Sequence, residues 1–548
     1  MARLTRRELL EGLAGLAAVS CTGRPAGRRL AGSIVGGSFS LGHRVRDGFR
    51  PAAPPRREEV GVLVLGAGIA GLSAAWALER AGFRDYRVLE LEDAPGGTAR
   101  SGANAVSPYP WAAHYVPVPP AANRPLVALL EEVGAITGRD AQGRPVCAEE
   151  MLCRDPQERL FFRGDWYEGL YPRVAASAED LAQLASFEAE MRRWAGVRDA
   201  RGRRAFAVPR SAGSDSEEVK ALDRLSMAAY LEAHGWTSPR LRWFVEYGCR
   251  DDFGATLADT SAWAGVHYFA ARLEDPRSES AEFLTWPEGN GRLVSHLAGM
   301  AGARLRTRVL VTEVDPRPDG VDVTAYDAAE DRVVGLRAGQ VIFALPRFLA
   351  SRLLVPWRQA PPPRLAETVY GAWMVANLTL SDRPASRGFP LAWDNVLYDS
   401  PSLGYVVATH QAGQDFGPTV LTYYRPFTDT DPRRARTRML STSWEEWVRL
   451  ILADLEPAHP GLERLVERVD VYLWGHAMVR PRPGFPWSEA LAACARPLGR
   501  VHFAHTDLSG MALFEEAQHW GVRAAEAVLR DRKHAFRSWF DPGTDPSS

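Results

Sequence analysis

The chain has 548 residues and a formal net charge of −1, because 66 lysines and arginines nearly balance 67 aspartates and glutamates. A nucleic-acid-binding domain usually carries a clear basic excess, so this charge argues against that class. Arginine supplies 64 of the 66 basic residues, which leaves Lys220 and Lys533 as the only lysines available for amine-based catalysis.

The length predicts roughly two to four domains, since a single hydrophobic core rarely grows to this size. The hydrophobic fraction of 46% and the charged fraction of 24% are typical of a globular protein. No uninterrupted apolar run is long enough for a transmembrane helix. The five cysteines are too scattered for a disulfide framework or a zinc site. Cys147 and Cys153 are either paired in an oxidising compartment or free thiols.

Residues 1–21 resemble a twin-arginine signal peptide. Arg6 and Arg7 precede a short apolar stretch that ends at Val19, which is the order of regions in a secretory signal. The cysteine that follows, Cys21, resembles the lipidated residue of a lipoprotein signal and is a candidate for a lipid anchor. This pattern predicts an exported protein, either periplasmic or anchored on the outer side of the inner membrane. The alternative is a short amphipathic helix.

A dinucleotide-binding pattern begins at residue 60. An apolar run at 60–65 predicts a buried parallel strand, GAGIAG follows at 66–71, and residues 72–81 predict a helix. The first glycine of the motif allows a tight turn, the second lets a pyrophosphate approach the backbone, and the third allows close helix–strand packing. The helix N-terminus would then face the phosphates with free N–H groups.

A second predicted strand at 87–89 leads into Glu90, which lies 19 residues after the last glycine of the motif (90 − 71). At this distance an acid accepts hydrogen bonds from the adenosine ribose hydroxyls, and Glu92 is the rival if the strand runs longer. The residues predicted to contact the dinucleotide are Gly66, Gly68, Ile69, Ala70, Gly71, Glu90 and Leu91.

The next segment distinguishes FAD from NAD. The sequence DAPGGTAR at 93–100 resembles the second glycine pair of the flavin amine oxidase superfamily. In that superfamily the glycines pass close to the cofactor, and a nearby arginine meets its phosphates. The resemblance assigns these roles to Gly96, Gly97 and Arg100, with Thr98 standing directly after the pair.

The end of the chain carries a matching pattern. Residues 500–504 predict a strand, residues 505–510 a turn, and a helix begins at Phe514. This order resembles the closing motif of the same superfamily, in which the helix N-terminus stabilises negative charge on the flavin ring. The resemblance implies FAD as the cofactor, with Asp507 at its ribityl or phosphate region, the backbone near Ala517 at its ring and the backbone around Val311 on its adenine side.

The resemblance implies an α/β fold with a Rossmann-like FAD-binding domain and an inserted mixed α+β substrate domain. We expect residues 111–280 to be mostly helical and residues 347–480 to include strands. The expected parts are a signal peptide (1–21), a linker or arm (22–59), three FAD-binding parts (60–110, 281–346 and 481–531), two substrate or cap parts (111–280 and 347–480) and a tail (532–548).

Aromatic residues are frequent in the two segments that we expect to approach the flavin. One segment directly follows the glycine pair, and the other precedes the last predicted strand. The candidates for the substrate pocket are Trp111, Tyr115, Trp474 and Trp487, and plain packing is the alternative for each.

Many flavin amine oxidases use a lysine bonded to a water near flavin N5. Lys220 lies in a charged stretch that predicts a solvated helix face, and Lys533 lies near the tail, so neither is a convincing candidate. A histidine could act as the base instead, and the candidates are His114, His476 and His505. No metal site is expected.

The resemblance implies an FAD-dependent oxidoreductase that oxidises an amine, a polyamine among the candidates, by hydride transfer to flavin N5. Asp251, Asp252 and Asp394 could receive a cationic substrate, with a surface role as the alternative. Two other functions stay open: a desaturase-like flavoenzyme acting on a CH–CH bond of an apolar substrate, and a non-catalytic binding protein on the same fold, as in the Rab escort group. The electron acceptor stays open between oxygen, a quinone and a carrier protein.

Overall fold

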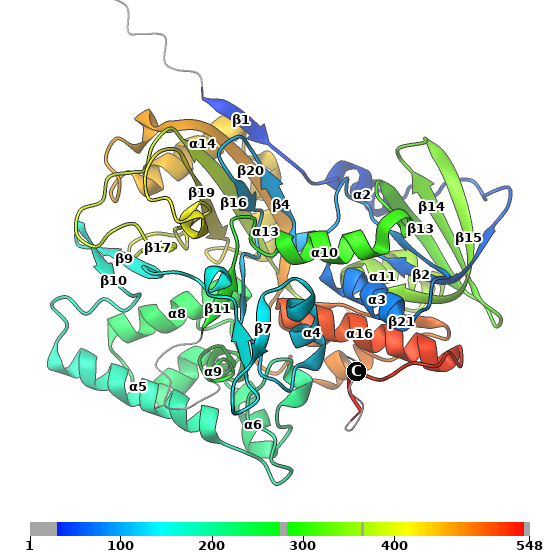
Figure 1. Ribbon diagram of the computed structural model, residues 1–548, viewed down its shortest axis with the longest axis horizontal. Coiled ribbons are helices and arrows are strands. Elements are labelled where there is room, and N and C mark those ends of the chain that lie inside the picture. The colour runs from blue at the N-terminus through cyan, green and yellow to red at the C-terminus, as the bar shows by residue number, and fades with distance from the viewer. Residues whose placement is uncertain (1–29, 274–281, 363–366, 542–548) are drawn as a thin grey trace, which may run out of the picture.

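The structure is a computed structural model that describes residues 30–273, 282–362 and 367–541. Two large sheets and a layer of helices build this part of the chain (Figure 1). The predicted signal peptide, including Cys21, lies outside the described residues. Within them, no helix combines the length and apolar character that a membrane span requires.

Seven strands form the sheet that carries the predicted dinucleotide pattern. Five of them run parallel, in the spatial order β12 (Leu305–Arg306), β3 (Tyr86–Leu89), β2 (Glu58–Leu65), β15 (Arg332–Phe343) and β21 (Val501–Phe503). The N-terminal half of β15 pairs with the antiparallel strand β14 (Val321–Asp327), which in turn pairs with the antiparallel strand β13 (Val309–Pro316). The apolar run of β2 is buried from Val60 onward, as expected for a central parallel strand.

Three helices pack together beside this sheet: α3 (Ile69–Arg80), α10 (Gly291–Ala301) and α16 (Phe514–Asp531). Glycine sets how closely α16 approaches α3, because a Cβ at Gly521 would lie 2.2 Å from the carbonyl oxygen of Ala70. Residues that are more than 440 positions apart in the sequence therefore meet where the first turn of α3 packs against the middle of α16.

The second sheet has eight strands. Their spatial order is β1 (Ala31–Ile34), β20 (Val466–Val479), β16 (Tyr370–Leu380), β19 (Thr419–Pro426), β18 (Tyr405–Val407), β17 (Asp394–Leu397), β9 (Glu158–Phe162) and β10 (Asp165–Glu168). The helices α13 (Pro432–Ser441) and α14 (Trp444–Leu455) pack beside β16 and β20. Strands β16 and β19 are buried along their whole length, so this sheet is the core of the substrate side.

A helical layer completes the substrate side. It contains α5 (Ala178–Gly196), α6 (Glu217–Ala221), α7 (Met227–Ala233), α8 (Pro239–Phe253) and α9 (Ala262–Ala270). The remaining elements are α2 (Phe39–Arg46), α4 (Arg124–Glu132), α11 (Ala350–Leu353), α12 (Val355–Gln359), α15 (Glu489–Cys494), β4 (Ser101–Ala103), β5 (Pro108–Pro110), β6 (Tyr115–Pro117), β7 (Ile136–Arg139), β8 (Pro145–Cys147) and β11 (Phe283–Thr285).

These elements confirm a mixed α/β fold and change two expectations. Residues 111–280 are not mostly helical throughout, because five strands precede α5 and two of them, β9 and β10, join the second sheet. The segment 22–59 is more than a linker, because β1 pairs with the edge of β20 and α2 packs beside β13. The thiols of Cys147 and Cys153 are both free.

We predict that Gly521→Ala destabilises the fold by about 1–3 kcal/mol, since the new methyl group overpacks the contact with Ala70. Urea unfolding followed by circular dichroism measures this loss. The matched control is Gly299→Ala in α10, where a Cβ would meet nothing within 4 Å, so stability should hold or rise by up to about 1 kcal/mol. Equal stability of the two variants would contradict the tight crossing.

Candidate functional site

The GAGIAG loop contains glycines of two kinds. At Gly66 a Cβ would lie 2.8 Å from the carbonyl oxygen of Ala344, and at Gly71 it would lie 1.9 Å from that of Gly66, so the protein itself requires both. At Gly97 a Cβ would lie 3.3 Å from the Cα of Gly68, so the close approach of the two loops favours glycine there. At Gly68, the N-cap of α3, a Cβ would meet only the Cα of Gly97 at an ordinary 4.0 Å, so Gly68 leaves a space that the protein's own packing does not require.

The first turn of α3 opens on this space. Leu72 is the first residue of the helix to donate an N–H, to the carbonyl of Gly68, so the N–H groups of Ile69 and Ala70 have no partner within the helix. No side chain caps this N-terminus. Free N–H groups and the positive end of the helix dipole form a site for a phosphate group.

The two candidate ribose acids have different partners. The Glu90 carboxylate accepts the N–H of Ala67 at 2.6 Å and that of Glu92 at 2.9 Å, which fixes it beside the glycine loop. Burial raises the pKa of Glu90, while these N–H donors oppose the shift. Glu92 instead accepts the N–H of Ser38 from the N-terminal arm, and Leu91 packs against Gly42 of the same arm.

The second glycine pair lies beside the first loop, where Gly96 bridges Gly68 and donates its N–H to Ala67. Arg100 follows, but its guanidinium is held by protein groups. It bonds Asp93 at 2.8 Å and the Tyr472 hydroxyl at 3.2 Å, and its side chain is 9% exposed. The structure therefore places Arg100 in an ion pair, and its contact with phosphate stays a prediction.

The closing motif places its carboxylate inside the protein. Asp507 accepts the N–H of Arg347 and the hydroxyl of Tyr370 on Oδ2, and Oδ1 lies 3.1 Å from Nδ1 of His505. Burial favours the neutral acid, but the His505 ring and the hydrogen bonds outweigh it and lower the pKa of Asp507. In α16, the N–H of Ala517 already bonds the carbonyl of Leu513. The helix N–H groups that lack an intrahelical partner therefore lie just before Ala517.

Two observations show that these residues fit FAD. Gly68 has no Cβ at the N-cap of α3 although the protein's own packing would accept one, which suits a pyrophosphate that approaches the backbone there. Asp507 Oδ1 is buried and its one contact is the His505 ring at 3.1 Å, so a ribityl hydroxyl could donate to its remaining lone pair. Val311 lies in β13, next to a bulge in its pairing with β14, so it is positioned by an edge strand of the same sheet.

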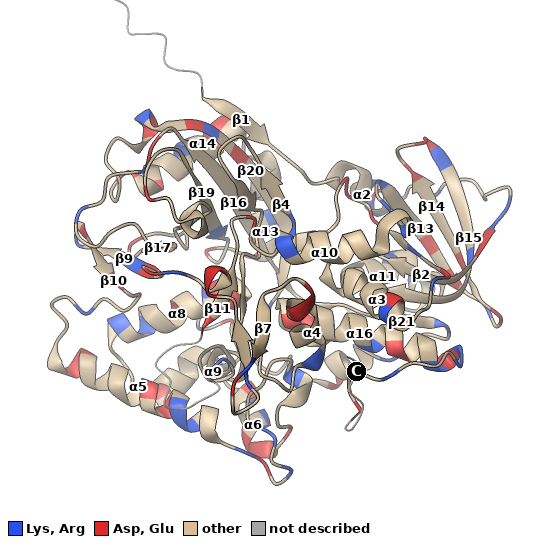
Figure 2. Ribbon diagram, in the orientation of Figure 1, with Lys and Arg blue, Asp and Glu red and all other residues tan. Residues whose placement is uncertain are grey.

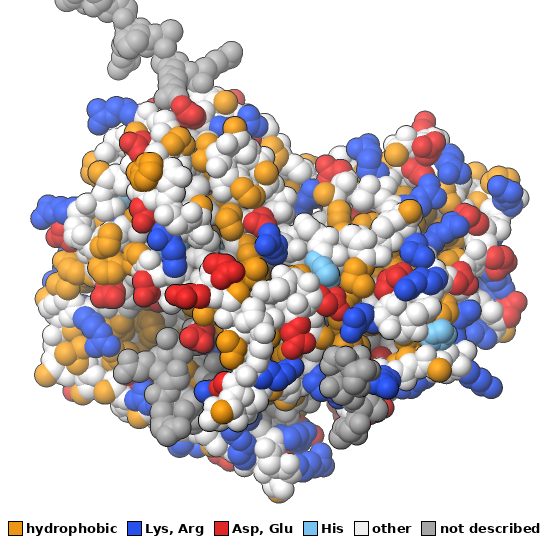
Figure 3. Space-filling model, in the orientation of Figure 1, with side chains coloured by type: hydrophobic (Ala, Val, Ile, Leu, Met, Phe, Trp, Pro, Cys, Tyr) orange, Lys and Arg blue, Asp and Glu red, His pale blue; other side chains and the backbone are white. Residues whose placement is uncertain are grey.

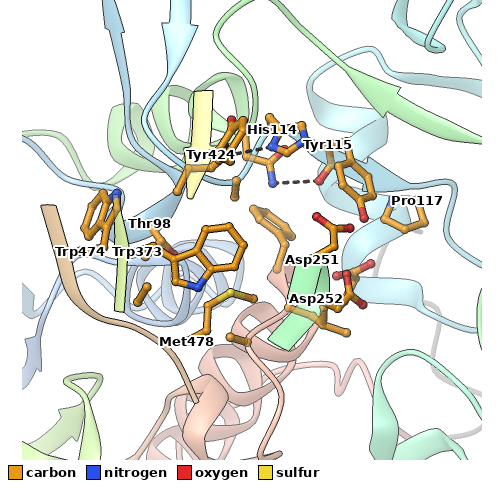
Figure 4. Close-up of a pocket in the computed structure, with 18 of the residues that line it drawn as sticks. Thr98, His114, Tyr115, Pro117, Asp251, Asp252, Trp373, Tyr424, Trp474 and Met478 are labelled. Carbon is orange, nitrogen blue, oxygen red and sulfur yellow. Dashed lines mark hydrogen bonds between the residues drawn. The ribbon is translucent and has the colours of Figure 1, made fainter. Parts of the chain in front are cut away.

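A cavity of about 140 Å³ lies between the eight-stranded sheet, the end of α8 and the start of α16 (Figure 4). We call it the inner cavity. Thr98 and the start of α16 line it from the predicted FAD side, and β16, β19 and β20 contribute Trp373, Tyr424 and Trp474. Asp251 and Asp252, at the end of α8, lie on the side opposite Trp474 (Figure 4).

A second cavity of about 230 Å³ adjoins it, and we call it the outer cavity. Five residues line both cavities: His114, Tyr115, Pro117, Asp251 and Arg272. The outer cavity adds the carboxyl groups of Glu158 and Asp394 and the rings of Tyr247, Tyr268, Phe269, Phe283 and Trp393.

Burial perturbs the acids of both cavities. It raises the pKa of Asp251 to about 7, with help from the neighbouring charge of Asp252, and it raises the pKa of Glu158 to about 7. Burial also raises the pKa of Glu515 to about 7 against the pull of Arg272. Burial and the charge of Glu158 raise the pKa of Asp394, although the Tyr247 hydroxyl donates to this carboxyl group at 3.0 Å.

The three candidate histidines occupy different places. His114 lines both cavities, and its Nδ1 lies 3.0 Å from the carbonyl of Ala112, which leaves Nε2 as the free ring nitrogen. Burial lowers the pKa of His114 to about 4, so the ring is neutral at pH 7. His476 stacks on Phe348 at 4.1 Å, and His505 pairs with Asp507. Neither of them lines the inner or the outer cavity.

The aromatic candidates for the substrate pocket also occupy different places. Tyr115 and Trp474 line the inner cavity. Trp111 packs behind them, and its carbonyl accepts the indole N–H of Trp474 at 2.8 Å. Trp487 lies in the helical layer against Trp263 and Arg210.

Sequence reasoning did not single out several residues that line the two cavities. Glu515 had one available signal, its place in the first turn of the predicted α16. Glu158 and Arg272 had none, because neither belongs to a motif or to a periodic pattern that indicates a cavity. Arg272 donates to both carboxylate oxygens of Asp252, at 3.1 and 2.9 Å, and so neutralises one acid of the pair.

We predict that Gly68→Ala weakens FAD retention at least about tenfold while leaving the fold intact, because its methyl group enters the space meant for pyrophosphate. Flavin absorbance per protein measures retention, and circular dichroism checks the fold. Gly138→Ala, where a Cβ would meet nothing within 4 Å, should keep its flavin. Full flavin content in Gly68→Ala would show that the space serves another purpose.

Lysine plays no part in the described cavities. Lys220 lies on α6, pairs with Glu217 at 3.3 Å and sits 5.7 Å from the ring of Trp487. We predict that Lys220→Ala keeps both bound flavin and turnover, each measured on the purified protein. Collapse of turnover with flavin retained would overturn this assignment.

The flavin containing amine oxidoreductase family model matches residues 69–529. A search of curated proteins found no match. Among solved structures, the chain resembles putrescine oxidase bound to putrescine (TM-score 0.61, 18% identity, covering 87% of this chain and 100% of that one). It also resembles cyclohexylamine oxidase from Brevibacterium oxydans IH-35A (TM-score 0.62, 18% identity, 87% and 100%).

A third similar structure is a fatty acid isomerase from P. acnes that produces CLA (TM-score 0.60, 15% identity, covering 86% of this chain and 98% of that one). At these identities the structural likeness shows the fold alone, whereas the family model covers most of the chain. The protein belongs to the flavin-containing amine oxidoreductase family and is an FAD-dependent oxidoreductase.

Proposed function

We propose that the enzyme oxidises an amine, and that its preferred substrates are diamines or polyamines. The single observation that carries the proposal is the charge of the two adjoining cavities. Asp251, Asp252, Glu515, Glu158 and Asp394 line them, and Arg272 is the only arginine or lysine among their described lining residues.

Burying an ionised carboxylate without a partner is energetically unfavourable, so such a group is either protonated or paired with a bound cation. Arg272 compensates Asp252. Asp251 and Glu158 have pKa values near 7 and form no direct ion pair among the described residues, because Arg272 bonds Asp252 instead. A substrate ammonium group would supply the missing positive charge. Glu158 lines only the outer cavity, whereas the start of α16 lines the inner one, and Asp251 lines both. These acids therefore suit an amino group that lies at a distance from the reacting one.

The aromatic walls suit the rest of such a substrate. The ring of His114 lies 4.9 Å from that of Tyr424 and 5.3 Å from that of Trp393, and Phe283 contacts Trp393 at 5.1 Å. Aromatic faces attract ammonium groups and bury methylene chains. A chain of methylenes between two amino groups could therefore extend from the inner into the outer cavity.

The protein's contribution to the reaction is positional. When bound, FAD supplies the two-electron oxidation, and we propose that the seven-stranded sheet binds it in the Rossmann manner. The neutral ring of His114 offers Nε2 as a proton acceptor inside the inner cavity. The surrounding aromatic rings exclude water.

Both amine oxidases among the similar structures agree with this proposal, whereas the fatty acid isomerase favours the alternative of CH–CH chemistry on an apolar substrate. The charge of the cavities distinguishes amine oxidation from CH–CH chemistry. A long apolar chain in the two cavities would bury several carboxylic acids without partners, which a diamine would not.

We predict that diaminobutane reduces the enzyme's flavin anaerobically much faster than butylamine does. Asp251→Asn should raise the apparent Kd for the diamine about tenfold or more, the cost of losing one charged contact. It should change butylamine reduction little. Stopped-flow absorbance of the flavin measures both, and Asp259→Asn, an exposed residue with the same charge change, is the control.

The pH dependence follows from the same acids. An ammonium group binds their ionised forms, which are lost as pH falls through about 7, the pKa of Asp251 and Glu158. Diamine affinity should therefore rise between pH 6 and 8 in the wild type and rise less in Asp251→Asn. Reduction by a fatty acid, with none by any amine, would reverse the choice of substrate.

We also propose export through the twin-arginine route, supported by Arg6, Arg7 and the apolar stretch after them. That route suits an enzyme that folds around its cofactor before crossing the membrane. Replacing both arginines by lysine should keep the protein inside spheroplasts, measured by fractionation, and Cys21→Ser should release any membrane-bound fraction. Unchanged distribution in the arginine variant would contradict export by this route.

A further inference from the structure

A large basic groove lies on the molecule apart from the two acidic cavities. Its volume is about 860 Å³, and it is bounded by the start of α4, residues 207–212, the middle of α16 and the C-terminal segment up to Phe540. Five arginines line it and no described lining residue is acidic; they are Arg124, Arg144, Arg198, Arg204 and Arg523. Figure 2 shows Lys and Arg positions along the chain near α4 and α6, and Figure 3 shows Lys and Arg side chains on the uncovered surface there.

The wall of the groove is built by specific contacts. Glu526 of α16, which is 1% exposed, accepts the Ser538 hydroxyl and the N–H of Trp539 at 2.7 Å each. The Trp539 ring stacks on Trp76 of α3 with centroids 5.1 Å apart. Arg124 donates to the carbonyl of Asp541 at 3.1 Å. These contacts fix the C-terminal wall, so the groove is formed before any ligand enters.

Two buried side chains in the wall each have one polar atom without a hydrogen-bond partner in the described part of the chain. Asn123 is 6% exposed and its Nδ2 has no hydrogen-bond partner in the described part of the chain. His519 is 5% exposed; Nε2 lies 2.9 Å from the Ser211 hydroxyl, and Nδ1 has no partner among the described residues. An unsatisfied buried amide costs about 1–3 kcal/mol. Asn123 also begins α4 without capping it, so the positive end of that helix dipole faces the same wall.

A narrow neck lies between the groove and the inner cavity. Its volume is about 20 Å³, which holds about one water molecule. It shares Asn123 and Val208 with the groove, and Arg272 and Glu515 with the inner cavity. An organic molecule in the groove therefore stays outside the neck, separate from the amine.

We propose that this groove binds an organic anion, a carboxylate, sulfonate or phosphate carried on an aromatic or apolar body. The arginine guanidinium groups match oxyanions in geometry and charge. Trp539, Phe540 and the prolines of the wall supply the apolar contact. The same arginines repel a cationic amine, so the groove and the acidic cavities select ligands of opposite charge.

The test titrates the flavin-loaded enzyme with anilinonaphthalene sulfonate, an aromatic anion whose fluorescence rises on binding. The double variant Arg198→Glu/Arg523→Glu changes two exposed groove arginines and should weaken binding at least about tenfold. The control Arg433→Glu/Arg434→Glu makes the same charge change on exposed residues of α13 and should shift binding less than about twofold. Phenylnaphthylamine, which lacks the sulfonate, should not distinguish the variants.

Equal affinity in the groove and control variants would overturn the proposal. So would competitive displacement of the probe by diaminobutane, because that result places the probe in the acidic cavities. Anaerobic reduction by diamine is measured in the same variants and should be unchanged. Loss of amine oxidation would leave the probe result intact, so failure of the proposed function and failure of the groove are distinguishable.

Discussion

The close crossing of α3 and α16 sets the geometry of the whole site. Gly521 leaves only hydrogen where any other residue would place a methyl group against the Ala70 carbonyl. The crossing packs the first turn of α3 against the middle of α16, a helix from the opposite end of the chain. The N-terminus of α3 opens beside Gly68, and the start of α16 forms part of the inner cavity with Leu513, Phe514 and Glu515. The cofactor site and the substrate cavity are therefore built on one helix pair.

Within that frame, buried charge decides what the cavities accept. The fold places five carboxyl groups around them and gives a strong arginine partner only to Asp252. Each remaining acid has an elevated pKa because burial penalises its ionised form. This penalty makes the cavities selective. A bound cation relieves the penalty of ionising the buried acids, whereas a neutral apolar chain leaves it in place. The basic groove beyond the neck has the reverse preference, for anions. Two sites that prefer ligands of opposite charge therefore lie on either side of the neck.

Local patterns predicted the elements of the cofactor side, because the strand, glycine loop, helix and second strand at 60–89 are consecutive in sequence. The same holds for the start of α16. The N-terminal arm was not predictable in this way, because β1 depends on pairing with β20, more than 430 residues later. Its Gly37 N–H bonds the Tyr472 hydroxyl, a contact that no local pattern indicates.

The substrate side was predictable only in part. Asp251 and Asp252 end a helix and Asp394 begins a strand, and a sequence cannot tell whether such positions face solvent or a cavity. Trp474 and Trp111 illustrate the same limit. Trp474 lines the inner cavity, whereas Trp111 lies behind it, and a single hydrogen bond joins them. Arg272 and Glu158 reach the site through long-range packing alone.

The central claim is that ionised carboxylates receive the substrate's positive charge. Proton release on binding tests it most directly, because a cation lowers the pKa of acids that titrate near 7. A non-oxidisable bis-quaternary ammonium ligand would be titrated into the flavin-loaded enzyme at pH 7 by calorimetry, in buffers of different ionisation enthalpy. The account predicts binding with net release of protons. Binding with no release, or with proton uptake, would contradict it.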